Sequence, residues 1–136
     1  MPKNYVADSS AVVAFLSRED EHHRWMTLQL SGFSQAWLTC EPALTEMFYL
    51  VGSRGRAQID ELLKRGVLKL AFNLETQLEP VLHLMDKYSN VPMSLADACL
   101  VRMTEVLADP VIITTDSDFN VYRRHSRQVI PCLMPD

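Results

Sequence analysis

A short run of β-branched residues that ends in two carboxylates constrains this chain more than any other feature. Residues 111–113 (Val-Ile-Ile) follow Asp109-Pro110 and precede the polar sequence Thr-Thr-Asp-Ser-Asp. An apolar run of this length, bounded by a proline and a polar turn, is typical of a buried strand in a parallel sheet. Open α/β sheets bind ligands beyond the carboxyl ends of their strands. The run therefore predicts an α/β fold with Asp116 and Asp118 at its functional edge.

Strand and helix patterns alternate along the rest of the chain. Short apolar runs predict strands at residues 4–7, 36–39, 67–72 and 129–133, in addition to 111–113. Helical periodicity and capping signals predict helices at about 9–16, 25–31, 41–51, 57–65, 79–88 and 94–107. Residues 52–56 (Gly-Ser-Arg-Gly-Arg) are predicted to form a basic turn. The helix that begins near Ser94 is apolar on most sides, so it is expected to lie in the centre of the domain.

The length and the cysteine content indicate one domain of a cytoplasmic protein. A chain of 136 residues fits a single domain over 1–136, large enough to bury roughly two-thirds of its unfolded surface. Cys40, Cys99 and Cys132 are odd in number and far apart, so we expect reduced thiols and no zinc site. The apolar run 11–16 is too short to span a membrane, and neither a signal peptide nor a membrane partner is expected.

Five acidic residues lie at the ends of predicted elements or on helices with little other polar character. Each has a purely structural explanation. Asp8 can cap the helix that follows it, Asp97 stands at capping-box spacing from Ser94, and an Asx-turn accounts for Asp116. Asp118, or the serine before it, can cap a helix that begins near residue 119. A partly exposed position would explain the remaining glutamate, whose helical neighbours are almost all apolar. The five are Asp8, Glu46, Asp97, Asp116 and Asp118.

A shared metal site explains all five acids together. If the strands before Asp8 and Asp116 are parallel neighbours, their backbones lie about 4.8 Å apart and both carboxylates can reach one ion. Asp97 can then close the third side. Carboxylates this close stay ionised only beside a cation, and oxygen ligands without His or Cys suit Mg²⁺ or Mn²⁺. We therefore expect Asp8, Asp97 and Asp116 to bind the metal, with Glu46 and Asp118 completing the cluster or acting through water. Such a site supports metal-assisted hydrolysis.

The net charge of −4 argues only weakly against a nucleic-acid partner. Five of the 17 acidic residues would belong to the metal site, and the other 12 nearly balance the 13 basic residues. Basic residues after Gly52 and around position 123 are candidates for contacts with RNA phosphates, although exposed arginines commonly serve only solubility. The candidates are Arg54, Arg56, Arg123 and Arg124.

The ordered set of acidic motifs resembles that of PIN-domain ribonucleases, especially the VapC-type toxins of toxin–antitoxin pairs. The order of the motifs matches across essentially the whole chain. They are Val6-Ala-Asp-Ser-Ser-Ala11, Leu44-Thr-Glu-Met47, Ser94-Leu-Ala-Asp-Ala98 and Thr114-Thr-Asp-Ser-Asp-Phe119. The resemblance implies a parallel sheet flanked by helices on both faces, a Mg²⁺ or Mn²⁺ site, and endonucleolytic cleavage of single-stranded RNA regions. It also matches Ser9 or Ser10, and Thr114, to polar positions that support the acids.

The same resemblance implies a cognate antitoxin, because an active ribonuclease endangers its own cell. Crowded carboxylates offer a binding site to an arginine, whose planar guanidinium can bridge two of them and displace the metal. A homodimer is also expected, since apolar helical residues at 47–51 and 78–85 could form a self-complementary patch. Core packing explains these two segments equally well.

Two other functions remain open from the sequence. The Asp-Ser-Asp triplet at 116–118 suggests a phosphatase of the haloacid-dehalogenase type, but that chemistry needs the pair after an early strand. The second alternative is a non-catalytic module that binds RNA or protein and whose acids only cap helices. Dependence on Mg²⁺ or Mn²⁺ distinguishes an enzyme from such a module, which should hold its partner without metal.

Overall fold

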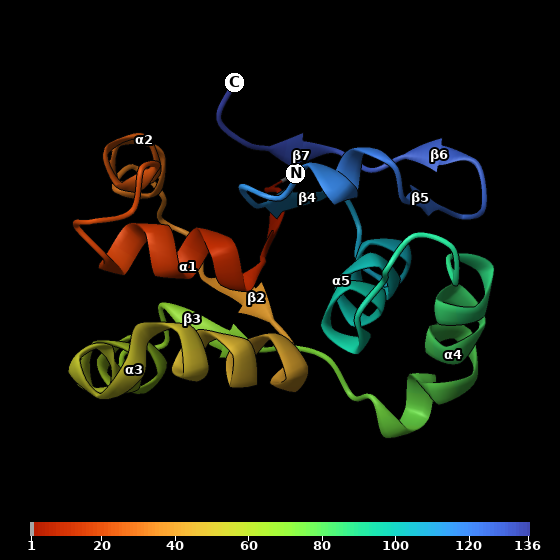
Figure 1. The fold of residues 1–136 in the computed structure, drawn as a ribbon, viewed down its shortest axis with the longest axis horizontal. Coiled ribbons are helices and arrows are strands. Elements are labelled where there is room, and N and C mark those ends of the chain that lie inside the picture. The colour runs from red at the N-terminus through yellow and green to blue at the C-terminus, as the bar shows by residue number, and fades with distance from the viewer. Residues whose placement is uncertain (1) are drawn as a thin grey trace.

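The computed structural model describes residues 2–136, and a parallel sheet lies at the centre of this part of the chain (Figure 1). Within the described residues the sheet has five strands in the order β3-β2-β1-β4-β7, all parallel. The chain proceeds from β1 outward to β3 and then returns to β4 on the other side of β1, so the strand order reverses between β1 and β4. The strands are β1 (Asn4–Ala7), β2 (Trp37–Thr39), β3 (Leu68–Leu70), β4 (Pro110–Ile113) and β7 (Cys132–Leu133).

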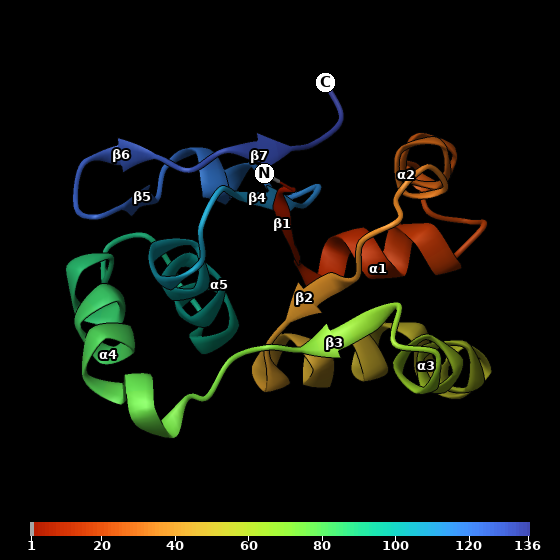
Figure 2. The same ribbon diagram turned by 180° about the vertical axis from the view of Figure 1, so that it is seen from behind.

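Helices cover the sheet on both sides, as Figures 1 and 2 show from opposite directions. The long helix α3 contacts both α1 and α5, and so joins the α1–α2 side of the molecule to the α4–α5 side. Every helix among residues 2–136 is too short or too polar to cross a membrane. The helices are α1 (Ser9–Leu16), α2 (His23–Leu30), α3 (Glu41–Lys64), α4 (Leu78–Lys87) and α5 (Leu95–Val106), with single 3₁₀ turns η1 (Glu75–Gln77) and η2 (Ser117–Asn120).

The two strands that carry the clearest sequence signals form the middle of the core. Val6 on β1 and both Ile112 and Ile113 on β4 are fully buried. Helix α5 is buried over most of its length, which confirms the prediction from its uniform apolar character. Cys40 and Cys99 are also buried. The predicted fold class, a parallel sheet flanked by helices, is thus confirmed.

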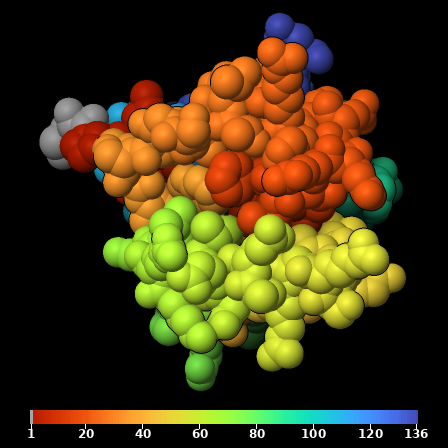
Figure 3. Space-filling view, turned by 90° about the vertical axis from the view of Figure 1, so that its left-hand side faces the viewer, coloured from red at the N-terminus to blue at the C-terminus, as the bar shows by residue number. Residues whose placement is uncertain are grey.

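The predicted basic turn at 52–56 was wrong, because the chain kinks at one residue and then continues as helix. Gly52 has φ of 64° and ψ of −165°, a backbone conformation that a residue with a Cβ rarely adopts. Arg54 and Arg56 therefore lie within the second half of α3. Figure 3 shows the side of the molecule on which this half of α3 and β3, in yellow to green, lies below the orange residues of α2 and the segment after it.

The predicted final strand at 129–133 is divided into two short strands with different partners. β6 (Gln128–Val129) pairs antiparallel with β5 (Arg123–Arg124) in a separate hairpin, and β7 pairs with β4 in the central sheet. Pro131 separates the two strands, and its lack of an N–H group suits a break in the pairing. The predicted edge strand at 67–72 is present as the shorter β3.

Candidate active site

The reversal of strand order places the ends of β1 and β4 side by side. Ala7 lies opposite Ile113 in the parallel register, and the Asp8 N–H group donates to the Ile113 carbonyl over 3.0 Å. Asp8 and Thr114 thus leave the sheet at the same level. This confirms that the strands before Asp8 and Asp116 are parallel neighbours, at the position where open α/β sheets bind ligands.

Asp8 is held by donors on both of its carboxylate oxygens. Its Oδ1 accepts from the Ser9 N–H group (2.8 Å), and its Oδ2 accepts from the hydroxyls of Ser10 (2.8 Å) and Thr114 (2.7 Å). The side chain is buried, and this burial raises the pKa of Asp8 above its ordinary value, with a further increase from the charge of Asp116. The hydrogen bonds oppose that shift because they stabilise the ionised form.

The hydroxyls around Asp8 also orient the next acids. The Ser9 hydroxyl donates to Glu46 Oε1 over 3.0 Å, which ties the start of α1 to α3. The Thr114 hydroxyl oxygen accepts from the Asp116 N–H group over 2.9 Å. The sequence left open whether Ser9 or Ser10 supports the acids, and the structure places both there, with Ser10 on Asp8 and Ser9 on Glu46.

Asp97 lies in the first turn of α5 and is supported by a residue that the sequence did not identify. Its N–H group donates to the Ser94 hydroxyl over 3.0 Å, as the capping spacing predicted. Its carboxylate Oδ2 accepts from the Tyr122 hydroxyl over 2.9 Å, and this contact ties the start of α5 to the segment after β4. Tyr122 is fully buried three residues after Phe119, and burial raises the pKa of its phenol, as does Asp97. It is therefore a permanent hydrogen-bond donor to Asp97.

Three carboxylates converge at the centre of the site. Asp97, Asp116 and Asp118 each offer an oxygen atom, and these atoms all lie within 4.8 Å of one another. The Asp118 N–H group donates to Asp116 Oδ1 over 2.9 Å, which holds the start of η2 in place. The pKa of Asp97 is raised to about 6, first by burial and also by the charges of neighbouring acids, while the hydrogen bond from Tyr122 opposes the shift.

The carboxylates open into a pocket of about 580 Å³. None of the described residues that line this pocket is a lysine or an arginine, so no side chain there neutralises the acids. Its lining consists of Asp8, Ser9, Ser10, Thr45, Glu46, Tyr49, Leu50, Pro92, Ser94, Asp97, Asp116 and Asp118. The pocket therefore contains all five acids that the sequence singled out.

This donor set fits a divalent cation. Carboxylate oxygens without His or Cys are the ligands that Mg²⁺ and Mn²⁺ prefer, and a cation would relieve the repulsion that acts on Asp97. The geometry groups Asp118 with Asp97 and Asp116, whereas both oxygens of Asp8 already accept hydrogen bonds. A ligand role for Asp8 stays a prediction.

None of the four candidate RNA-binding arginines is among the residues that line the acidic pocket. Arg54 lines another hollow, of about 440 Å³, and Arg56 is exposed on α3. The Arg123 guanidinium donates to the Asn120 carbonyl over 2.7 Å and also reaches the next two carbonyls of its own turn. That these residues contact RNA stays a prediction.

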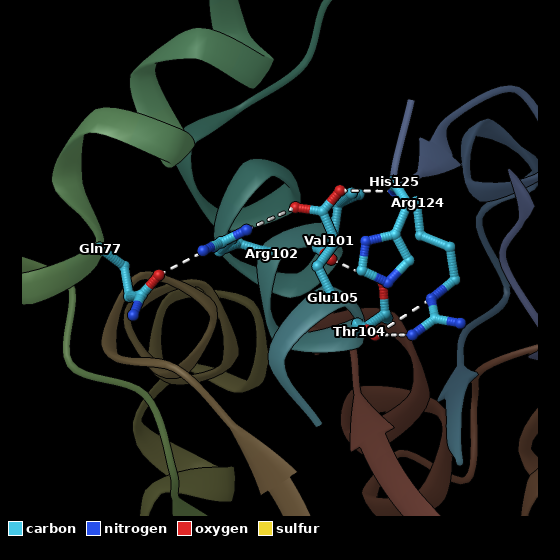
Figure 4. Close-up of polar contacts among 7 residues, drawn as sticks. All are labelled: Gln77, Val101, Arg102, Thr104, Glu105, Arg124 and His125. Carbon is cyan, nitrogen blue, oxygen red and sulfur yellow. Dashed lines mark hydrogen bonds and ion pairs between the residues drawn. The ribbon is translucent and has the colours of Figure 1, made fainter. Parts of the chain in front are cut away.

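Arg124 belongs to a network that attaches the β5–β6 hairpin to α5 (Figure 4). Its guanidinium donates to the Thr104 carbonyl, and the Glu105 carboxylate accepts from the His125 N–H group over 2.7 Å. Thr104 lies seven residues after Asp97, about 10 Å further along the helix. Arg124 thus satisfies a carbonyl near the C-terminal end of α5, and Asp97 lies near the N-terminal end.

Comparison with known proteins agrees with this arrangement. The profile of the PIN domain family matches residues 5–124, which is most of the chain. The fold is similar to the crystal structure of Mycobacterium tuberculosis VapC20, described as a Sarcin-Ricin loop cleaving toxin, with a TM-score of 0.77 and 15 % sequence identity over 87 % of this chain and 94 % of that one. No curated protein sequence matches the chain. The family match, with all four acidic motifs inside it, shows that this chain belongs to the PIN domain family.

Proposed function

We propose that this protein is a metal-dependent endoribonuclease that hydrolyses phosphodiester bonds in single-stranded regions of RNA, with residues 1–136 as one nuclease domain. The observation that carries the proposal is the convergence of Asp97, Asp116 and Asp118 within 4.8 Å in a pocket at the switch point of the sheet. Membership in the PIN family and the shared fold with a protein described as a Sarcin-Ricin loop cleaving toxin support RNA as the substrate class.

In this proposal the carboxylates have different roles. Asp97, Asp116 and Asp118 would hold a Mg²⁺ or Mn²⁺ ion, with Asp8 as a further candidate ligand. Such an ion supplies positive charge beside the scissile phosphate and lowers the pKa of water. Glu46 is held by the Ser9 hydroxyl on the α3 side of the same pocket, where it can accept a hydrogen bond from the attacking water.

Cleavage should depend strictly on the divalent ion. We expect the purified protein to cut single-stranded RNA with Mg²⁺ or Mn²⁺ and to lose this activity in EDTA. Binding to the folded site should also raise the midpoint of thermal unfolding, by on the order of 5–10 °C at an ion concentration about 100 times the dissociation constant. Gel analysis of RNA fragments and a melting curve with and without Mn²⁺ measure the two effects. Full cleavage in EDTA would contradict the proposal.

The same assay separates the two alternatives. A haloacid-dehalogenase-like phosphatase would release phosphate from a small phosphomonoester and leave the RNA chain intact. A non-catalytic module would bind RNA equally well with and without metal. The family favours neither alternative. The phosphatase mechanism needs the pair of acids after an early strand, whereas the Asp-Ser-Asp triplet follows β4, near the end of the chain.

We further propose that the protein is the toxin of a toxin–antitoxin pair in the cytoplasm. An acidic pocket whose described lining contains no lysine or arginine is a favourable site for an arginine of an inhibitor. Expression of the protein alone should arrest growth. Co-expression with the neighbouring reading frame should give a complex that no longer cuts RNA, and excess Mg²⁺ should partly restore cleavage. Normal growth with intact RNA during expression of the protein alone would count against the toxin assignment but not against the nuclease.

A homodimer remains part of this proposal. Of the two apolar segments expected to form its interface, one contributes the exposed Tyr49 and Leu50, whereas Met47 is fully buried and belongs to the core. The other contributes Leu78 and Leu82 on α4, which are about half exposed. The mass measured by light scattering at several concentrations tests the dimer directly.

A further inference from the structure

An aromatic ring at the acidic pocket is left almost entirely in solvent. Tyr49 is 85 % exposed, although it lines the same pocket as the carboxylates, and Leu50 beside it is 56 % exposed. When a fold uses a tyrosine in its core, the side chain typically buries roughly 150–250 Å² of surface. The Tyr49 ring is therefore not part of the core of this protein. Pro92, which is also exposed, completes the apolar part of the pocket wall.

The position of Tyr49 is fixed relative to the acids. Tyr49 follows Glu46 by three residues on α3, so the two side chains lie on the same face of the helix, with their Cβ atoms about 5–6 Å apart. Glu46 is in turn fastened to Ser9 at the start of α1. An RNA phosphate placed at the carboxylates therefore brings an adjoining nucleobase close to the ring.

We propose that Tyr49 is a substrate-binding residue whose ring stacks on one nucleobase of the RNA strand, with Leu50 and Pro92 completing the apolar surface under that base. The inference rests on the proposed nuclease function and adds how the strand is held. Base–aromatic stacking needs no complementary charge and accepts every base, because every base has a π-face. It selects single-stranded RNA, since only an unpaired base can leave its neighbours and stack on a protein ring.

The charge of the pocket favours a contact with a base over a contact with a phosphate. The described residues that line it include five acids and no lysine or arginine. The phosphates of a nucleic-acid backbone are negatively charged, so an acidic pocket wall does not attract them except where a bound cation compensates the carboxylates. An uncharged contact is therefore the one that this wall can offer to the strand, and Tyr49 supplies the largest apolar surface for it.

The space for the strand continues beyond the first hollow. A second hollow of about 540 Å³ shares Thr45, Glu46 and Ser94 with the first and extends to Phe72 and Leu74. Tyr49 lines only the first hollow. The stacked base should accordingly lie on one side of the scissile phosphate, at one defined nucleotide.

Steady-state kinetics on a short single-stranded RNA that spans a mapped cleavage site test the role of the ring. We expect Tyr49→Ala to raise KM on the order of tenfold with kcat close to the wild-type value, because stacking is equally strong in the bound substrate and the transition state. Tyr49→Phe should retain the wild-type KM, since it keeps the ring, and Tyr49→Leu should be intermediate. Leu28→Ala, a change at an exposed apolar residue of α2, is the matched control and should leave both constants unchanged.

A scan of the substrate with abasic nucleotides gives the decisive measurement. For the wild-type protein, removal of the base at one position beside the cut should raise KM about as much as Tyr49→Ala does, and the two changes together should cost little more than either alone. Independent losses, or no sensitive position, would overturn the inference. So would a dimer that dissociates in Tyr49→Ala with all substrates affected equally, or an antitoxin that binds Tyr49→Ala weakly while KM for RNA is unchanged.

Failure of the nuclease proposal has a different signature. A wild-type protein that cuts no RNA with Mg²⁺ or Mn²⁺ overturns both proposals together. Metal-dependent cleavage that is indifferent to Tyr49→Ala overturns only the role of the tyrosine.

Discussion

Asp116→Asn should lower kcat for RNA cleavage on the order of a thousandfold or more while the protein stays folded. Asp116 is one of the three carboxylates whose oxygens lie within 4.8 Å of one another, and its N–H group is fixed by the Thr114 hydroxyl. An amide keeps the shape of the side chain and an oxygen that can accept from the Asp118 N–H group. The amide lacks the negative charge that binds a divalent ion and balances the positive charge of that ion.

The measurement compares cleavage rates at limiting Mg²⁺ for the wild type and the variant, with circular dichroism to verify the fold. Asp86→Asn, the same chemical change at an exposed residue of α4, is the matched control and should cut at the wild-type rate. Undiminished cleavage by Asp116→Asn would remove this residue from the metal site. An equal loss in both variants would point to an effect of overall charge.

The second large effect concerns stability, and it arises one turn away at η2. Phe119→Ala should reduce the free energy of unfolding by about 3–5 kcal/mol, because it removes a large side chain that is fully buried and leaves a cavity. The ring packs edge-on against Tyr122, with centroids 5.4 Å apart at an interplanar angle of 89°. Tyr122 is the residue that donates to Asp97, so the same packing orients a site carboxylate.

Urea unfolding followed by circular dichroism measures this loss, with an unchanged m value as the sign of an unaltered unfolded state. Val121→Ala, a truncation at a half-exposed residue two positions away, should change the stability by about 0.5 kcal/mol or less. A loss below about 1 kcal/mol for Phe119→Ala would show that the core closes around the missing ring. Most domains have only about 5–15 kcal/mol of stability, so the expected loss is a large fraction of the total.

The close link between packing and site explains why both effects are concentrated after β4. Residues 114–122 contribute Thr114 to Asp8, Asp116 and Asp118 to the carboxylate group, and Tyr122 to Asp97. Phe119 anchors this segment in the core. A change in its packing should therefore reduce activity as well as stability, whereas Asp116→Asn should reduce activity alone.

The sequence by itself determined the central strands, the buried helix α5 and the acids of the site. The β-branched run 111–113 and the apolar residues of α5 are local signals, since burial on both faces of a strand or on most sides of a helix needs a continuous apolar stretch. The four acidic motifs identified the family because their order along the chain is itself the pattern. Helix capping by Ser94 was also readable, as it depends on a spacing of three residues.

Only the tertiary structure decided which acids converge and what holds them. The contacts from Ser9 to Glu46, from Tyr122 to Asp97 and from Arg124 to Thr104 join positions 20 to 37 residues apart. No local periodicity encodes such pairs, because they depend on how whole elements pack. The same holds for the grouping of Asp118 with Asp97 and Asp116 and for the division of residues 129–133 between two sheets. The kink at Gly52 looked like a turn in sequence because a glycine permits both, and only the structure shows that the helix resumes after it.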